Sequence, residues 1–182
     1  MENFIVFGIL SIPILLLSWR TLLNPGSHGF YRFFSWECIA WLLASNYRFW
    51  FENAFSIRQI FSWIFLFLGA YLFIAGVIWL KKVGKPAKTR NDEVLFQFEK
   101  TSELVDTGIF KTIRHPLYSS LIFLTWGIFL KQPTFFLSLI AVLSTAFLYL
   151  TAISDEKECV RYFGDKYLEY RKHTKMFVPW VI

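Results

Sequence analysis

Cysteine and the motifs of soluble cofactor enzymes are scarce in this sequence. It has two cysteines, Cys38 and Cys159, and neither a metal-ligand spacing nor a disulfide framework follows from them. No GxGxxG or Walker-type phosphate loop occurs, and no GxSxG or Cys–His nucleophile pattern is present. The sequence therefore does not support a soluble dinucleotide-binding domain or a nucleophile-dependent hydrolase.

Histidine is also rare, and acidic residues are fewer than basic ones. The histidines His28, His115 and His173 are too scattered to predict a metal site, so we expect no metal. The chain has 19 Lys and Arg against 13 Asp and Glu, which gives a net charge of +6. Such an excess indicates a nucleic-acid partner only if its placement does.

Apolar residues, by contrast, are abundant. They make up 55% of the 182 residues, and the mean hydropathy is +0.45. Soluble domains usually contain about 45–50% apolar residues. The excess lies in long runs, and a bilayer-spanning helix needs about 20 such residues. We therefore predict an all-α polytopic membrane protein with about five transmembrane helices: Phe4–Leu23, Phe33–Phe51, Ile57–Leu80, Leu117–Leu130 and Phe135–Ile153.

Two features distinguish these runs. The last two are separated only by the sequence KQPT, which predicts a tight antiparallel helical hairpin. The second run contains Glu37 and Arg48, which lie about three helical turns apart and therefore on one face of a continuous helix. We expect this pair to serve the structure or a substrate pathway, because charged groups are costly in a bilayer.

The basic residues predict the orientation of the chain. With five spans and the N-terminus outside, 16 of the 19 Lys and Arg fall on the cytoplasmic side. The polar segment Lys81–Lys111 and the tail Ser154–Ile182 then share that side. Membrane topology thus explains the positive charge, and no nucleic-acid partner is required.

We expect one integral membrane domain over residues 1–182. Residues 1–80 form the three N-terminal spans, and residues 81–182 form a loop, the helical hairpin and a C-terminal cytoplasmic cap. The sequence does not indicate an oligomeric state.

The stretch TGIFKTIRHPLYSSLIFLTWGIFL, residues 107–130, places Arg114 and His115 before Pro116. Proline fits the first turn of a helix, where free backbone N–H groups and the positive end of the helix dipole lie. Two readings are open. Arg114 and His115 form a site for a carboxylate or phosphate, or they anchor the helix at the headgroup level.

A second polar cluster follows the last span. Asp155 and Glu156 can hold an ammonium group or a ribose diol, or they form a solvated helix end with basic partners. The aromatic residues nearby are equally an interfacial belt or the lid of a pocket: Tyr162, Phe163, Tyr167, Tyr170 and Phe177.

Taken in order, ELVDTGIFKTIRHPLY, the apolar hairpin, DEKECVRYFGDKYLEY and FVPW resemble the isoprenylcysteine carboxyl methyltransferase family. The wider group includes phospholipid N-methyltransferases of the same membrane architecture. The resemblance covers about residue 81 to the C-terminus.

The resemblance implies a membrane methyltransferase that uses S-adenosylmethionine and a lipophilic, lipid-modified or membrane-embedded acceptor. It places two sequence segments and the acidic pair at the cofactor. These residues are Ser102, Glu103, Leu104, Val105 and Phe110, then His115, Pro116, Leu117 and Tyr118, and finally Asp155 and Glu156. Aromatic faces such as Phe110 and Tyr118 suit the sulfonium. Arg114 is the one candidate for a catalytic role.

The chain departs from the family pattern at two positions. Asp155 stands where the family usually has Glu. Thr151 stands where prenylcysteine enzymes have an Arg that serves the substrate carboxylate, so the acceptor contact is assigned to Thr151 and the departure favours an amine acceptor. A non-catalytic membrane scaffold of the same fold is the alternative from another class.

Overall fold

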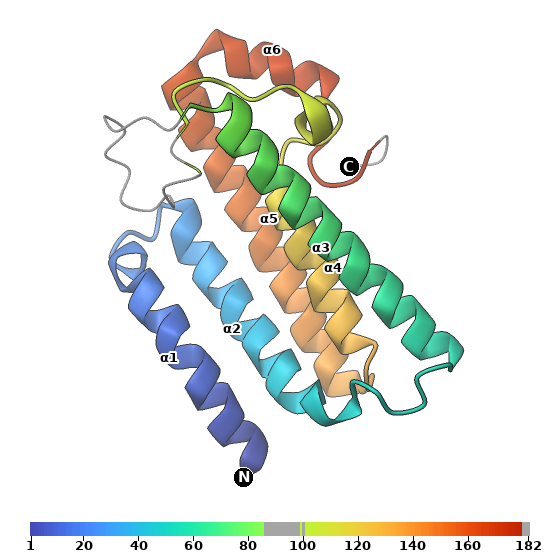
Figure 1. Cartoon of the computed structure of the whole chain (residues 1–182). Helices are drawn as coiled ribbons and strands as arrows, with labels where there is room; N and C mark the ends of the chain where they lie inside the picture. Colours follow the sequence, from blue (N-terminus) through green and yellow to red (C-terminus); the bar gives the residue numbers. More distant parts are fainter. Residues whose placement is uncertain (86–98, 100, 180–182) are drawn as a thin grey trace.

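The computed structural model describes residues 1–85, 99 and 101–179, and the chain in these ranges is helical (Figure 1). The elements in chain order are α1 (Glu2–Leu22), α2 (His28–Asn46), the short 3₁₀ helix η1 (Tyr47–Phe49), α3 (Ile57–Val83), the 3₁₀ helix η2 (Gly108–Lys111), α4 (Pro116–Phe129), α5 (Phe135–Phe163) and α6 (Asp165–His173). The prediction of an all-α fold is confirmed. Residues 86–98 and 100 of the predicted polar loop lie outside the described ranges, as does Trp180 of the FVPW motif.

Three of the described helices, α1, α3 and α5, are long and apolar enough to cross a membrane. The helix α4 is apolar but has only 14 residues. The predicted hairpin is present as α4 and α5, which lie side by side and are joined by a short turn at Lys131 (Figure 1).

Two predicted boundaries are wrong. The helix α2 ends at Asn46, so Arg48 lies in η1 and does not share a helix face with Glu37. The helix α5 continues ten residues beyond the predicted Ile153 and stops at Gly164, which has a φ of 60°. Asp155 and Glu156 therefore lie inside a helix, because the residues that follow them favour helix until the glycine ends it.

The helices pack through small and hydroxyl-bearing residues. A Cβ placed on Gly69 of α3 would lie 3.0 Å from the carbonyl oxygen of Ser120 in α4. Ser62 of α3 donates a 2.7 Å hydrogen bond to the carbonyl of Gly127 in α4. Close approach of this kind is typical of helices that pack within a bilayer, where small residues let backbones touch.

The helix α1 is held at two levels, by α2 and by η1. Ser11 donates a 2.6 Å hydrogen bond to a carboxylate oxygen of Glu37, and Arg48 forms an ion pair with Glu2 near the N-terminus. Glu37 thus has a hydrogen-bond donor from α1, which lowers the cost of a carboxylate in this setting. The interaction supports a structural role for Glu37.

At the end of the bundle that carries the α4–α5 turn, Lys131 is completely buried. Its Nζ atom lies 3.7 Å from the ring centroid of Trp63 and 5.2 Å from that of Trp50. It also donates a 3.0 Å hydrogen bond to Oε1 of Gln59. These cation–π and hydrogen-bond contacts hold the turn against the start of α3.

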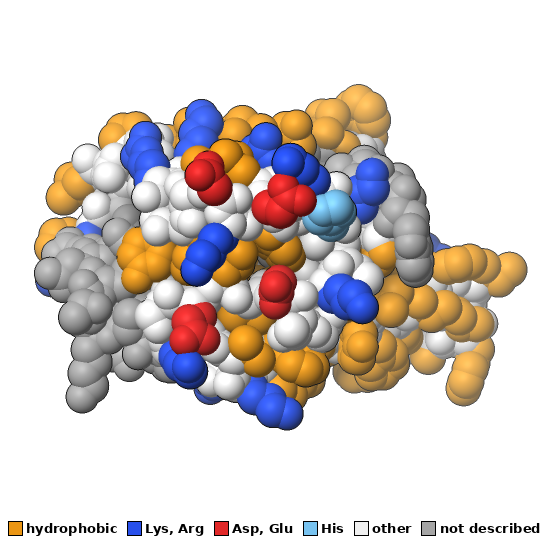
Figure 2. Space-filling view, turned by 90° about the horizontal axis from the view of Figure 1, so that it is seen from above, with side chains coloured by type: hydrophobic (Ala, Val, Ile, Leu, Met, Phe, Trp, Pro, Cys, Tyr) orange, Lys and Arg blue, Asp and Glu red, His pale blue; other side chains and the backbone are white. Residues whose placement is uncertain are grey.

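At the opposite end, the C-terminal segment crosses the start of α4. The backbone N–H groups of Arg114 and His115 donate to the carbonyls of Lys175 and Met176 at 2.8 and 3.1 Å. The N–H of Lys175 donates in turn to the carbonyl of Thr112 at 3.0 Å. Seen from this end, acidic and basic side chains gather over α6 and the neighbouring elements (Figure 2).

Candidate active site

A cavity opens between the ends of α3, α4 and α5, and the segment before α4 together with α6 covers it. The empty space within it is about 710 Å³, part of which is open to solvent. A concave, mostly apolar lining that carries a few polar and charged groups is typical of small-molecule sites.

The start of α4 forms one wall of this cavity. Pro116 is the first residue of the helix, and His115 before it has a φ of −121° and a ψ of 61°, outside the helical region that the residue before a proline avoids. The His115 ring stacks on Tyr118 with centroids 5.3 Å apart. The N–H groups of Arg114 and His115 are both occupied by the C-terminal segment, so they are not open to an anion.

Asp155 faces the cavity from α5 and is held by α4. One of its carboxylate oxygens, Oδ2, accepts a 3.1 Å hydrogen bond from the Tyr118 hydroxyl and lies 3.5 Å from Nδ1 of His115. The other, Oδ1, has a weak 3.8 Å contact with the thiol of Cys159. Asp155 thus presents an oriented carboxylate whose second oxygen has capacity for a ligand.

Glu156 is adjacent to Asp155 in the sequence, but its carboxylate contacts arginine side chains. Its Oε1 atom accepts a 2.8 Å hydrogen bond from Nε of Arg114, and its Oε2 atom lies 3.5 Å from Arg171. Arg114 also donates to the carbonyl of Thr174. Glu156 and Arg114 therefore join α5, the start of α4 and the C-terminal segment within one network.

The protonation of His115 follows from these carboxylates. Burial by itself lowers the pKa of His115, but hydrogen bonds and charge from Asp155 and Glu156 more than offset burial and raise it. The two carboxylates therefore stabilise the imidazolium form more than the surroundings of an ordinary histidine do.

Aromatic side chains close the cavity opposite α4. Phe110 and Tyr167 are buried, and the Tyr170 hydroxyl donates a 2.7 Å hydrogen bond to the carbonyl of Phe110. Burial raises the pKa of Tyr170, so its hydroxyl remains a donor at neutral pH. This contact fixes α6 over the segment before α4, and the aromatics form a lid.

Nine of the residues predicted to contact the cofactor or to act in catalysis line the cavity: Leu104, Val105, Phe110, Arg114, His115, Pro116, Leu117, Tyr118 and Asp155. Ser102 and Glu103 line a more open depression beside it. Thr151 is buried, and its hydroxyl donates to the carbonyl of Phe147 in its own helix at 2.7 Å. Of the site residues predicted from the sequence, Thr151 and Glu156 line neither of these two spaces.

The lining also contains residues that were not assigned to the cofactor: Phe163, Tyr167 and Tyr170, named only as a possible belt or lid, and Leu80, Glu99, Thr101 and Cys159, not named for the site at all. Helical spacing was an available signal for two of them, because Cys159 and Phe163 follow Asp155 by one and two turns. Of the tail aromatics, Phe163, Tyr167 and Tyr170 form the lid, whereas Tyr162 is exposed.

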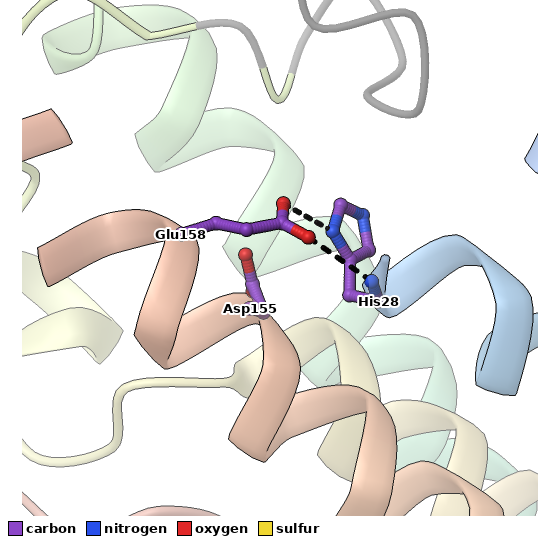
Figure 3. A group of neighbouring side chains, drawn as sticks. All are labelled: His28, Asp155 and Glu158. Atoms are coloured by element: carbon purple, nitrogen blue, oxygen red, sulfur yellow. Dashed lines mark hydrogen bonds and ion pairs between the residues drawn. The ribbon is translucent and has the colours of Figure 1, made fainter. Parts of the chain in front are cut away.

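A further polar group adjoins Asp155 on the side of α2. Glu158 accepts hydrogen bonds from both the backbone N–H and the ring Nδ1 of His28, at 3.1 and 2.7 Å (Figure 3). Donor atoms of His28, Asp155 and Glu158 lie within 4.8 Å of one another, a spacing from which a metal ion can be held. No sequence pattern pointed to this group, since His28 and Glu158 are 130 positions apart.

Residues 60–166 match the phospholipid methyltransferase family. This match spans more than half of the chain, and the protein belongs to that family. The apolar helices and the family together indicate an integral membrane protein.

Two curated relatives are similar over a shorter stretch. A methanethiol S-methyltransferase 1 of Bradyrhizobium diazoefficiens is 26% identical over 72 residues, which is 40% of this chain and 25% of the relative. A methanethiol S-methyltransferase of Pseudomonas deceptionensis is 30% identical over 71 residues, 39% of this chain and 26% of the relative. The chain thus matches about a quarter of the length of these proteins. No solved structure matches it.

Proposed function

We propose that this protein is an integral membrane methyltransferase that transfers a methyl group from S-adenosylmethionine to a lipophilic or small-molecule acceptor. The observation that carries the proposal is the cavity in which Tyr118 and His115 orient the carboxylate of Asp155. All three residues lie within the part of the chain that matches the family.

The side chains around the cavity fit this cofactor. Asp155 has a carboxylate oxygen available for the ammonium or a ribose hydroxyl, and Glu99 adds a second acidic group to the lining. His115 and Arg114 are cationic groups suited to the cofactor carboxylate. The aromatic lid offers flat apolar faces to the adenine ring and electron-rich faces to the sulfonium. The positive and the negative groups of the cofactor thus each have side chains of opposite charge in the lining of the cavity.

The bound cofactor supplies an electrophilic methyl group, and the protein supplies position and surroundings. Asp155 and Tyr118 fix the polar end of the cavity, and Tyr170, hydrogen-bonded to the carbonyl of Phe110, covers it from α6. Alignment of the methyl group with the acceptor atom accounts for most of the acceleration, because in-line displacement depends on near-attack geometry. Arg114 acts through Glu156 as a positioning residue in this arrangement.

The proposal includes a topology of five spans with the N-terminus outside. The distribution of 16 of 19 basic residues on the side of the cavity supports a cytoplasmic site and C-terminus. The chain then forms one domain, in which residues 81–182 carry most of the cofactor site and α1 to α3 complete the membrane bundle.

Two classes of methyl acceptor are compatible with the proposal. The names of the two relatives favour a thiol, and the family name favours a phospholipid amine. A prenylcysteine carboxylate is disfavoured, because Thr151 is buried against its own helix and offers no cation for it.

Calorimetry of the purified protein with S-adenosylhomocysteine tests cofactor binding. We expect binding by the unchanged protein and by Glu52→Gln, an exposed acidic residue at the other end of the bundle, and a loss of about 100-fold for Asp155→Asn. Absence of binding by the unchanged protein would refute the proposal.

Mass spectrometry tests the acceptor. Membranes containing the protein are incubated with isotopically labelled S-adenosylmethionine, and the products are separated into thioethers, N-methyl lipids and base-labile methyl esters. We expect label in a thioether or an N-methyl lipid. Cofactor binding without any labelled product would favour the scaffold interpretation instead.

A further inference from the structure

The cofactor cavity and the more open depression beside it share a wall. Leu104, Phe163 and Tyr170 line both spaces, so these three side chains form the partition between them. Leu104 comes from the segment before α4, Phe163 is the last residue of α5, and Tyr170 lies on α6. A movement of one of these side chains away from the others would therefore connect the cavity with the depression.

The depression is polar, whereas the cavity wall formed by α3 and the start of α4 is apolar. The depression is lined by acidic and basic side chains, which are Glu103, Asp106, Glu169, Lys111 and Lys166. Toward α3 and the start of α4, the cavity is lined by Leu80, Pro116 and Leu117. S-adenosylmethionine carries a sulfonium, an ammonium and a carboxylate, and charged groups are costly to move past apolar side chains. The polar depression is therefore the more favourable path for this cofactor.

A single neutral hydrogen bond closes the partition. The Tyr170 hydroxyl donates at 2.7 Å to the carbonyl of Phe110, which belongs to η2 and also lines the cavity. Both groups are uncharged, and a bond of this kind contributes less than one that involves a charged group. Burial raises the pKa of Tyr170, so its hydroxyl keeps the proton that it donates.

The two ends of α6 are held more firmly than its middle. Beyond its last turn, the guanidinium of Arg114 donates to the carbonyls of Arg171 and Thr174, and backbone hydrogen bonds hold residues 175 and 176. At its start, α6 follows α5 directly through Gly164. Lifting the whole helix would break several charged and backbone hydrogen bonds, whereas turning the Tyr170 side chain breaks one neutral bond. The side-chain movement is therefore the less costly way to open the partition.

We propose that the depression is the vestibule through which the cofactor enters and the demethylated product leaves, and that the Tyr170 side chain is the gate between vestibule and cavity. This inference rests on the proposed methyltransferase function and adds the way in which the site exchanges its cofactor. The closed gate has the Tyr170 hydroxyl on the Phe110 carbonyl. The open gate has this hydroxyl turned into the vestibule, where water replaces the carbonyl as its partner.

Two other roles of the Tyr170 hydroxyl predict different behaviour. A hydroxyl that only stabilised the fold would affect unfolding and leave the exchange of cofactor unchanged. A hydroxyl that bound the cofactor would slow its dissociation and leave its association unchanged. A gate instead acts on the barrier between the free and the bound state, so loosening it speeds association and dissociation by the same factor and leaves Kd unchanged.

The test measures the exchange of tritiated S-adenosylhomocysteine by the whole chain in detergent. Dissociation is followed after addition of excess unlabelled ligand, and association is followed by rapid filtration. We expect Tyr170→Phe to raise both rate constants about 5-fold, the factor for loss of one neutral hydrogen bond, and to change Kd by less than about 2-fold. Tyr149→Phe, which alters an exposed tyrosine that lines neither space, should exchange at the unchanged rate.

A second pair of variants tests the vestibule. Lys166 lines the depression, whereas Lys172 is another exposed lysine of α6 that lines neither space. We expect Lys166→Trp to lower both rate constants by a common factor, because an indole ring narrows the path, and we expect Lys172→Trp to change neither. Because both lysines are exposed, neither substitution disturbs the packing of the fold.

The outcomes separate this inference from the proposed function. Unchanged exchange in Tyr170→Phe would overturn the gate, and so would faster dissociation without faster association, which would show a direct contact with the cofactor. Unchanged exchange in Lys166→Trp would overturn the vestibule. Binding by the unchanged protein without either kinetic change overturns this inference alone, whereas absence of binding by the unchanged protein refutes the proposed function as well.

Discussion

Lys131 at one end of the bundle and Arg114 with His115 at the other end are all buried cations, but their surroundings differ. Lys131 is enclosed by the indole rings of Trp50 and Trp63 and by the neutral amide of Gln59. Arg114 and His115 are enclosed by the carboxylates of Asp155 and Glu156.

The difference distinguishes a structural contact from the proposed binding site. The ammonium of Lys131 is held between aromatic faces and an amide oxygen, and its partners are all neutral. At the other end, acidic and basic groups share one network, and Asp155, which lines the cavity, has only a weak 3.8 Å contact with a thiol at its Oδ1 atom. Charge that is oriented but not fully paired is the property expected of a site that awaits a charged ligand.

The largest effect is expected from Arg114→Ala. This change leaves the buried carboxylate of Glu156 without its 2.8 Å partner, and loss of one member of a buried ion pair costs about 3–5 kcal/mol. Denaturant unfolding in detergent should show this loss, whereas Arg171→Ala, whose side chain is half-exposed, should cost less than about 1 kcal/mol. Equal losses for the two variants would show that the network is not held by Arg114.

Lys131→Ala should have the next largest effect, and on stability alone. The variant loses the cation–π contacts and leaves Oε1 of Gln59 without its donor, at a cost of about 2 kcal/mol. S-adenosylhomocysteine affinity should not change. Thermal unfolding and calorimetry on the same preparation check both statements. A fall in affinity would contradict the separation of the two ends.

Tyr118→Phe should have a smaller effect, confined to the cavity. It removes the 3.1 Å hydrogen bond to Asp155 and keeps the stacking on His115. A single hydrogen bond to a charged group contributes about 1.5 kcal/mol or more, so we expect at least about a 10-fold loss in S-adenosylhomocysteine affinity. Tyr149→Phe is the matched control on α5, and it should bind normally.

The smallest expected effect is a change of stability with pH. The folded-state pKa of His115 is raised, so its contribution to stability is complete below the unfolded pKa of about 6.5 and is lost as pH rises through the folded pKa. The unfolding temperature of cofactor-free protein should therefore fall across this range, and His115→Gln should reduce the fall. An identical pH dependence in both proteins would contradict the assignment.

Most of the helical framework was predictable from hydrophobic length. The runs that form α1, α3 and the α4–α5 hairpin were placed within a few residues, because long apolar runs and a four-residue break leave few alternatives. The C-terminal end of α5 was not predictable from hydropathy, since the helix continues through charged residues to Gly164.

The sequence predicted many of the residues that line the candidate site, but not how they are arranged around it. Adjacent residues on a helix point about 100° apart, so the sequence alone does not tell which of Asp155 and Glu156 faces the cavity. The rotation of α5 is decided by its packing. The hydrogen bond between His28 and Glu158 could not be predicted either, because the two residues are 130 positions apart and no local sequence pattern connects them.

The hydrogen bonds between residues 112–115 and the C-terminal segment at Lys175 and Met176 also have a consequence for biosynthesis. The membrane helices precede this segment in the chain and can enter the bilayer while synthesis continues. The start of α4 receives its backbone partners only after residues 175 and 176 have left the ribosome. Insertion and the acquisition of a complete site are therefore separate events, in that order.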